Sequence, residues 1–471
     1  MTKPGPDGAR PSGLPMVAPP DPAALDEERR WLAEMEDAPA WTRAIAYLRR
    51  GGPGYLQSAL TLGGGTAMFS LFAGAAFGYQ LLWVAPVSML LGVVMLAAVA
   101  HQTLSTGMRP FDAMRVHAGP VFAWGWAIGA VLSSIIWQFA QYALASAVLA
   151  DMCSFAAGLS IGEGTAGLIV LANAVAFVWM YGASSRWMRL FETLMKGMVW
   201  AIVLCFGLVV ARTGVAHAGD LARGYFAFSI PGEVNGVHGA TVVLSGLAAA
   251  IGVNMLFLYP YSLLAKGWGR EHRRLARFDL LAGMFVPYSL ATGLMIVATA
   301  NAFHYGELEF TGTGLAPVDA ARALTAVVGP GVARVVFNLG ILGMAWSSIT
   351  LQMLCCGFVA TELLGWRVGS LRYRLACLLP APGVIGAFLW NDVKLWLAVP
   401  TTILCGFLLP LAYVGFCKLQ RSRAYLGEDL PRGGRATAWF GTMVFTTLLL
   451  TAFLGWYALT KGPGYLEGLR R

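Results

Sequence analysis

Charged side chains are scarce in this chain of 471 residues. Asp, Glu, Lys and Arg make up 12% of the sequence, whereas hydrophobic residues make up 57%. The charged share is about half of that in soluble globular domains. Together with a mean hydropathy of +0.64, it excludes a water-soluble enzyme, a disordered chain and a small disulfide-bonded secreted scaffold. The composition predicts a polytopic membrane protein whose main partner is the lipid bilayer.

Motifs that would indicate an enzyme or a metal-binding domain are missing as well. The seven cysteines fall in or beside hydrophobic segments without zinc-site spacing, and no two histidines form an H-x-x-x-H pair. Neither a Walker phosphate loop nor a nucleotide fingerprint follows a predicted strand, so we do not expect transport driven by ATP. We expect no enzymatic activity, no cofactor and no nucleic-acid partner.

Hydrophobic segments long enough to cross a bilayer follow one another from residue 55 onward. A helix of about 20 apolar residues spans the hydrocarbon core. The sequence predicts about eleven such helices, near 55–73, 77–100, 119–150, 164–182, 190–211, 240–265, 278–303, 331–364, 371–390, 394–417 and 437–459. The predicted fold class is therefore an all-α polytopic membrane protein.

The distribution of basic residues predicts the orientation in the membrane. Eleven helices place the two termini on opposite sides, and 25 of the 33 Lys and Arg residues then lie on the amino-terminal side. Because basic loops stay in the cytosol, we expect a cytosolic amino terminus, an extracytosolic carboxyl terminus and location in the inner (plasma) membrane. The polar residues 1–50 lack a signal-peptide pattern and are expected to form a disordered cytosolic tail.

Two of the hydrophobic segments contain residues that disfavour a continuous helix. Gly63, Gly64 and Gly65 stand together in the first segment, and each costs about 1 kcal/mol relative to alanine in a helix. The sixth segment contains Asn254 and Pro260, so we expect a break over this stretch. Broken helices at corresponding places in two repeats indicate the substrate site of a secondary transporter. A close helix–helix contact is the alternative explanation for the glycines.

The spacing of the two broken helices predicts how the chain is organised. They are the first and sixth of the predicted spans, as expected for two five-helix repeats. This division gives a tail over 1–50, a first repeat over 51–215 and a second repeat over 216–420. The remaining residues, 421–471, would contain a cytosolic loop, a peripheral eleventh helix and a short extracellular tail.

Several motifs carry a resemblance to a known family. They are GPGYL at 52–56, FGYQLLWV at 77–84, Trp346-Ser347-Ser348 followed by Glu362, LRYR at 371–374 and LLPLA at 408–412. In these motifs the chain resembles the NRAMP (natural resistance-associated macrophage protein) family of proton-coupled divalent-metal transporters. The resemblance covers nearly all predicted spans. It implies a LeuT-like fold of two inverted five-helix repeats with broken first and sixth helices.

The resemblance also implies a metal site at the two breaks, but the residues there differ from the family's pattern. Uncharged residues stand at the family's metal-binding positions: Gly63, Gly64, Gly65 and Thr66 in place of a D-P-G-N motif, Asn254 and Met255 in the sixth helix, and Thr402 in the tenth. A shift of one residue in the sixth helix would put Met255 at the family's sulfur position. Gln138 and Gln141 stand where the family has two acids of its proton path.

These departures change the chemistry expected of the site. A bare divalent ion is costly to bury without anionic ligands, and soft metals prefer thiolate, thioether or imidazole donors. Neutral donors, of which Thr66 and Asn254 are the candidate metal ligands, suit a hydrated cation such as Mg²⁺ better. We therefore expect an NRAMP-like secondary transporter of a metal cation, working by alternating access with altered proton coupling. The alternatives are a transporter of a small organic amine or neutral solute, and a non-transporting receptor or scaffold.

Overall fold

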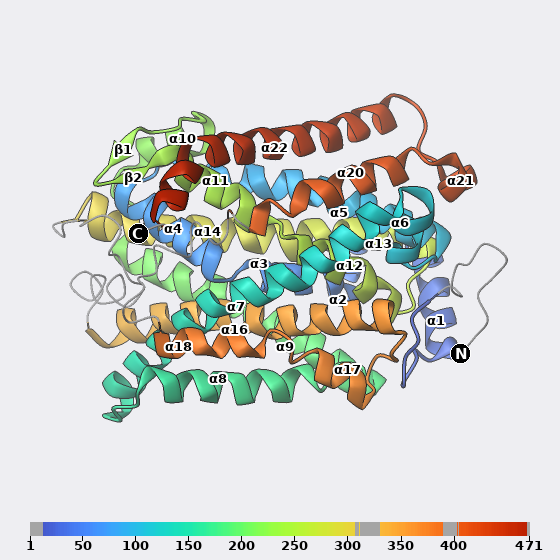
Figure 1. The fold of residues 1–471 in the computed structure, drawn as a ribbon, viewed down its shortest axis with the longest axis horizontal. Coiled ribbons are helices and arrows are strands. Elements are labelled where there is room, and N and C mark those ends of the chain that lie inside the picture. Colours follow the sequence, from blue (N-terminus) through green and yellow to red (C-terminus); the bar gives the residue numbers. More distant parts are fainter. Residues whose placement is uncertain (1–12, 307–309, 311–329, 390–402, 404, 469–471) are drawn as a thin grey trace.

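The computed structural model is a long bundle of helices with one short hairpin (Figure 1). It describes residues 13–306, 310, 330–389, 403 and 405–468, without the side chains of 330–333 and 461–468. Within these residues, seven helices are long and apolar enough to cross a membrane, or up to eight if one bent pair counts as a single span. The predicted all-α membrane fold is confirmed.

The first five predicted spans are all helical in the structure. Their bounds are α3 (Pro53–Thr61) with α4 (Gly64–Phe77), α5 (Val84–Thr106), α7 (Pro120–Ala157), α8 (Glu163–Val178) and α9 (Ser185–Thr213). The short α6 (Pro110–His117) connects α5 to α7. After α9 come α10 (Ala218–Phe226) and the antiparallel hairpin of β1 (Glu233–Val234) and β2 (Val237–His238), at the opposite end of the bundle from α1 (Figure 1).

The second half begins with another pair of consecutive helices. The helices of this half are α11 (Gly239–Ala250), α12 (Val253–Ala265), α13 (Arg273–Leu280), α14 (Val286–Thr299), α16 (Pro330–Leu364), α17 (Leu371–Ala376), α18 (Gly386–Leu389), α20 (Leu409–Gln420), α21 (Arg423–Leu426) and α22 (Gly434–Gly468). A π-helical turn over Leu281–Phe285 joins α13 to α14. The predicted spans 371–390 and 394–417 lie only partly within the described residues, so the expected total of eleven stays a prediction.

Residues 13–50 differ from the expected disordered tail, because they contain α1 (Pro22–Glu34) and α2 (Ala40–Arg50). The Asp21 carboxylate accepts a hydrogen bond from the Ala23 N–H (3.0 Å) and caps α1. Tyr47 of α2 packs edge-on against Phe278 of α13, with ring centroids 5.6 Å apart. A few buried aromatic contacts thus order a segment whose overall composition is polar.

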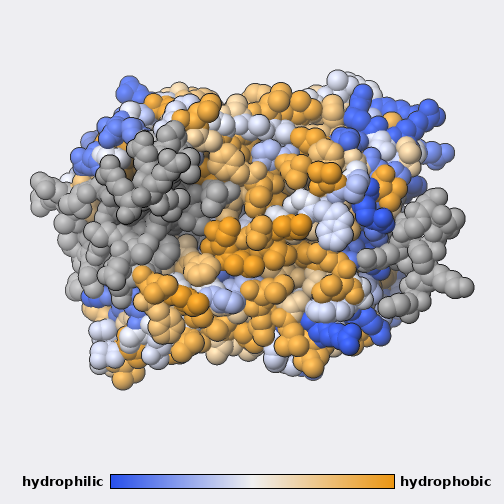
Figure 2. All heavy atoms as spheres, viewed as in Figure 1, coloured by the Kyte–Doolittle hydropathy of each residue, from blue (hydrophilic) through white to orange (hydrophobic). Residues whose placement is uncertain are grey.

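The surface agrees with a membrane-spanning bundle. Figure 2 shows apolar side chains across the middle of the visible face and hydrophilic ones toward the two ends. Large apolar side chains such as Leu204 and Leu448 are 64% and 63% exposed, which lipid but not water would favour. Inside this belt, α7 and α16 pack along one another beside the broken helices.

Candidate functional site

The first membrane span is broken at Leu62 and Gly63. The chain bends by 56° between α3 and α4, so the three-glycine segment does interrupt the helix as predicted. The backbone carbonyls at the end of α3 therefore lack helical partners. Three hydroxyl groups satisfy them: Ser347 donates to Ala59 (2.9 Å), Ser348 to Leu60 (3.0 Å) and Thr66 to Thr61 (2.7 Å).

The second break lies earlier in the chain than predicted. Helix α11 ends before Ile251 and Gly252, and α12 then runs without interruption from Val253 to Ala265. Pro260 lies inside α12, so the prediction of a break from Asn254 to Pro260 is wrong. Proline is tolerated within membrane helices when neighbouring groups satisfy the freed backbone. Pro260 cannot donate a backbone hydrogen bond, but α12 continues through this residue.

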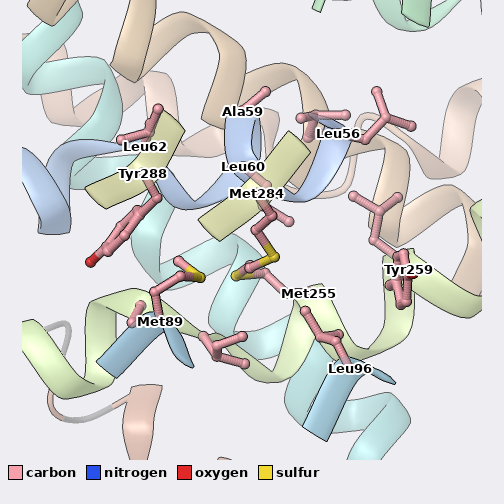
Figure 3. Packing of buried hydrophobic residues seen from close by; sticks show 14 of the residues in the cluster. Leu56, Ala59, Leu60, Leu62, Met89, Leu96, Met255, Tyr259, Met284 and Tyr288 are labelled. Atoms are coloured by element: carbon pink, nitrogen blue, oxygen red, sulfur yellow. The ribbon is translucent and has the colours of Figure 1, made fainter. Parts of the chain in front are cut away.

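A cavity of about 20 Å³ lies where the two breaks meet. This is enough for one water molecule or one small ion. Its wall includes five predicted site residues: Gly63, Gly65, Thr66, Gln141 and Met255. It also includes six residues that the sequence had not singled out as ligands: Leu60, Thr61, Trp137, Ala249, Ser348 and Gln352. In Figure 3, Leu60 lies near the end of α3, Leu62 lies in the unwound segment, and Met255 comes from α12.

A chain of hydrogen bonds connects the polar side chains of this wall. The Gln141 side-chain oxygen accepts from the Gly64 N–H (2.7 Å), and its Nε2 donates to Ser348 Oγ (3.1 Å). Gln352 Nε2 also donates to Ser348 Oγ (3.3 Å). The Gln352 Oε1 is buried and has no hydrogen-bond partner among the described residues. An unpartnered buried oxygen is costly, and a ligand in the cavity would relieve that cost.

The thioether of Met255 is the soft donor of the site. Its Sδ lies 2.8 Å from the Thr61 hydroxyl oxygen, which is itself 3.1 Å from the carbonyl oxygen of Ala250. The Gly252 N–H also points at this sulfur, at 3.3 Å. Met255 therefore joins the two breaks, with α3 on one side and the start of α12 on the other.

Four predicted site residues are not among those that line the cavity: Gly64, whose N–H donates to Gln141, and Asn254, Gln138 and Thr402. The Asn254 amide donates to Ser134 Oγ (3.3 Å) and its oxygen accepts from the Met255 N–H (2.9 Å), so it fixes the start of α12. Gln138 donates to the carbonyl of Ile349 (3.0 Å). Thr402 lies outside the described residues.

The missed residues had usable signals. Ser348 belongs to the Trp-Ser-Ser motif, and Gln352 follows it by four residues on an apolar helix, which places both side chains on one face. Two polar residues on one face of a deep membrane helix mark a buried cavity.

The donors around the cavity are neutral amide, hydroxyl and carbonyl oxygens with one thioether. Within the part of the chain that the structure describes, no group of three or more His, Cys, Asp or Glu residues could hold a metal ion. Two discontinuous helices around a central polar cavity define a secondary transporter of the broken-helix class.

The family model described as "Natural resistance-associated macrophage protein-like" matches residues 54–456. The chain therefore belongs to the NRAMP family, as its motifs predicted, and this is a family of transporters and not of enzymes. The divalent metal cation transporter MntH of Ralstonia nicotianae is 27% identical over 462 residues, which are 95% of this chain and 98% of that protein.

Solved structures agree on the fold. The manganese transporter of Eremococcus coleocola superposes with a TM-score of 0.69 at 16% identity, over 94% of this chain and 90% of that one. Mhp1, a transporter of the nucleobase-cation-symport-1 family, gives 0.57 at 14% identity, over 87% and 92%. The LeuT-like fold predicted from the sequence is confirmed.

Proposed function

We propose that this chain carries a divalent metal cation by alternating access, with the cavity between the two breaks as its substrate site and Mg²⁺ as the first candidate ion. The observation that carries the proposal is the ion-sized, polar cavity lined by residues of both broken helices. The family and the relatives named as divalent metal cation transporters support the substrate class.

The neutral lining favours an ion that keeps some of its water. No carboxylate lines the cavity to offset the charge of a bare divalent ion. Mg²⁺ sheds water reluctantly and is often held through its hydration shell. In the present conformation the cavity holds about one water molecule. A partly hydrated ion would therefore enter when α3 moves away from α12.

We also propose that proton coupling in this chain does not use the family's path. Gln138 and Gln141 occupy the positions of the two acids, and an amide does not change its charge between pH 4 and 9. Both glutamines are buried and engaged with α16 or α4. They hold the helices together in place of relaying protons.

Uptake into proteoliposomes tests the proposed substrate. We expect the wild type to take up Mg²⁺, and Mn²⁺ more weakly, and the Thr66→Ala variant to lose most of this uptake because Thr66 lines the cavity. The matched control is Thr361→Ala. This change also removes a buried hydroxyl that donates to a carbonyl, but Thr361 lies on α16 and does not line the cavity. Uptake of neither ion by the wild type, or equal loss in both variants, would contradict the proposal.

A small organic amine is the second candidate, because Trp137 adds an aromatic face to a neutral cavity wall. Only ligands that bind the folded state raise its melting temperature, so a thermal-shift screen of amines, amino acids and metal ions separates the two. Stabilisation by divalent ions alone argues against the amine. Binding without any flux would instead favour the receptor or scaffold alternative.

We propose the orientation that the basic residues predict. The end of the bundle that carries α1, α2 and α21 would face the cytosol, and the carboxyl end of α22 would face outward. Labelling single cysteines placed in α1 and in the β1–β2 hairpin with an impermeant reagent on intact cells tests this arrangement.

A further inference from the structure

An apolar groove of about 400 Å³ lies between α20 and α22, away from the transport cavity. Its wall consists of Val414, Cys417, Lys418 and Arg421 on one side, and Phe440, Val444, Thr447 and Leu448 on the other. Each set repeats every three or four residues, so each forms one face of a helix. The two helices run side by side along the edge of the bundle (Figure 1).

The groove is apolar along its length and cationic at one end. Lys418 lies in the last turn of α20, and Arg421 follows the helix directly. The Lys418 ammonium donates to the carbonyl of Ala118 (2.7 Å) and lies 4.6 Å from the ring of Phe122. Among the described residues this is its one printed hydrogen bond, so two of its three N–H groups have no acceptor there. The Arg421 guanidinium lies 5.1 Å from the ring of Phe440, which holds it at the mouth of the groove.

These two cations have no acidic partner in the described part of the chain, since no ion pair involves either of them there. The carboxylate of Asp429, in the same loop between α20 and α22 as Arg421, is engaged by Arg270 and Arg273. Partial burial opposes its ionisation, but the hydrogen bond and charge of Arg273, together with Arg270, hold the pKa of Asp429 below its usual value. Asp429 is therefore ionised, and its negative charge is balanced by Arg270 and Arg273. It does not compensate the charges of Lys418 and Arg421.

We propose that this groove binds an anionic phospholipid of the adjacent leaflet. The phosphate would lie between Lys418 and Arg421, and one acyl chain would follow the apolar wall past Val444 and Leu448. Two uncompensated cations beside an apolar groove at the polar end of a membrane bundle are complementary to such a lipid. A soluble anion would gain nothing from the apolar wall, and a zwitterionic lipid would gain less from the two charges.

Native mass spectrometry of the purified full-length protein tests the headgroup. After titration with phosphatidylglycerol or phosphatidylcholine of the same acyl chains, we expect at least one retained phosphatidylglycerol per chain and much weaker retention of phosphatidylcholine. The Lys418→Gln/Arg421→Gln variant should bind phosphatidylglycerol about tenfold more weakly. The matched control is Arg186→Gln/Arg372→Gln, which removes two exposed charges from the same end of the bundle, outside the groove.

A second variant tests the acyl-chain contact independently of charge. Val444→Trp fills the apolar wall and should also weaken retention, while leaving the headgroup cations in place. Equal retention of the two lipids, equal loss in the control variant, or unchanged binding in both groove variants would overturn the proposal. A dimer that disappears with the groove variants would likewise overturn it, because a second copy would then occupy the groove.

Discussion

Gly63 illustrates how a single residue can set the chemistry of the site. Its backbone is extended, with φ −129°, so its geometry does not require glycine. A Cβ at this position would instead lie 2.6 Å from Gln141 Nε2 and 2.7 Å from Ser348 Oγ. Gln141 and Ser348 thus occupy the space that an aspartate would need. A side chain at position 63 and the glutamine at 141 therefore compete for the same space.

The coupling between these two residues can be measured. We expect Gly63→Ala to lower the free energy of unfolding by about 1–3 kcal/mol, through overpacking against Gln141 and Ser348. When Gln141 is also replaced by alanine, Gly63→Ala should lower the free energy of unfolding clearly less. A double-mutant cycle measured by chemical denaturation would then be non-additive. The control is Gly197→Ala in α9, where a Cβ meets nothing within 4 Å and should be neutral or slightly stabilising. Additive effects would refute the coupling.

At this scale the sequence predicted part of the site. Gly63, Gly65, Thr66, Gln141 and Met255 line the cavity, and they could be predicted because the three-glycine segment and the family motifs fix their register. The spacing of Ser348 and Gln352 places both on one face of α16, but which cavity that face lines depends on how α16 packs against the two breaks. Asn254 does not line the cavity, because its side chain bonds to the Met255 N–H and to Ser134 instead.

At the scale of elements, α3 is held at both ends by other helices. At its carboxyl end Ser347 and Ser348 of α16 satisfy the free carbonyls. At its amino end the buried Asp279 carboxylate of α13 accepts from the Gly54 N–H (2.6 Å). A negative group at a helix amino terminus interacts favourably with the helix dipole. Opening toward this end of the bundle by movement of α3 would break the contact with Asp279.

The anchor at Asp279 predicts a graded loss of stability. Asp279→Asn keeps an acceptor but loses the charge and should cost about 1 kcal/mol. Asp279→Ala loses both and should cost about 2–3 kcal/mol, because a buried N–H is left unpaired. The readout is the melting temperature in detergent, with Asp220→Asn in the exposed part of α10 as control. Equal melting temperatures for all variants would show that Asp279 does not anchor α3.

The positions of the long helices were predicted better than the places where helices are interrupted. The hydrophobic segments located the long helices because about 20 apolar residues have few other structures available in a membrane. The break in the sixth span was misplaced because Pro260 is the stronger sequence signal. In the structure the interruption at Ile251 and Gly252 has a tertiary contact beside it, the Thr61 hydroxyl of α3 donating to the carbonyl of Ala250, and a local one, the Gly252 N–H to the sulfur of Met255.

At the scale of the whole molecule, residues 13–50 join loops that belong to both predicted repeats. Arg109, between α5 and α6, donates to the carbonyl of Gly13 (2.9 Å). Val17 donates to the carbonyl of Val368, between α16 and α17, at 2.9 Å. The two helices then pack on α13 and its preceding turn. The segment therefore ties together, at one end of the bundle, parts that alternating access would have to separate.

This arrangement predicts that the amino-terminal segment restrains opening at its end of the bundle. A chain lacking residues 1–18 loses the bonds to Arg109 and Val368 but keeps α1 and α2. Its α3 amides should then exchange with deuterium about tenfold faster, an effect of about 1.4 kcal/mol, because the hydrogen bonds that Gly13, Pro15, Met16 and Val17 make with residues 107–109 and 367–368 are lost. Helix α22, which shares no backbone hydrogen bond with residues 13–18 in the part of the chain that the structure describes, is the internal control. Because α3 is anchored by Asp279 as well, combining the truncation with Asp279→Asn should accelerate its exchange further. Unchanged α3 exchange in both chains would mean that another part of the molecule holds this end closed.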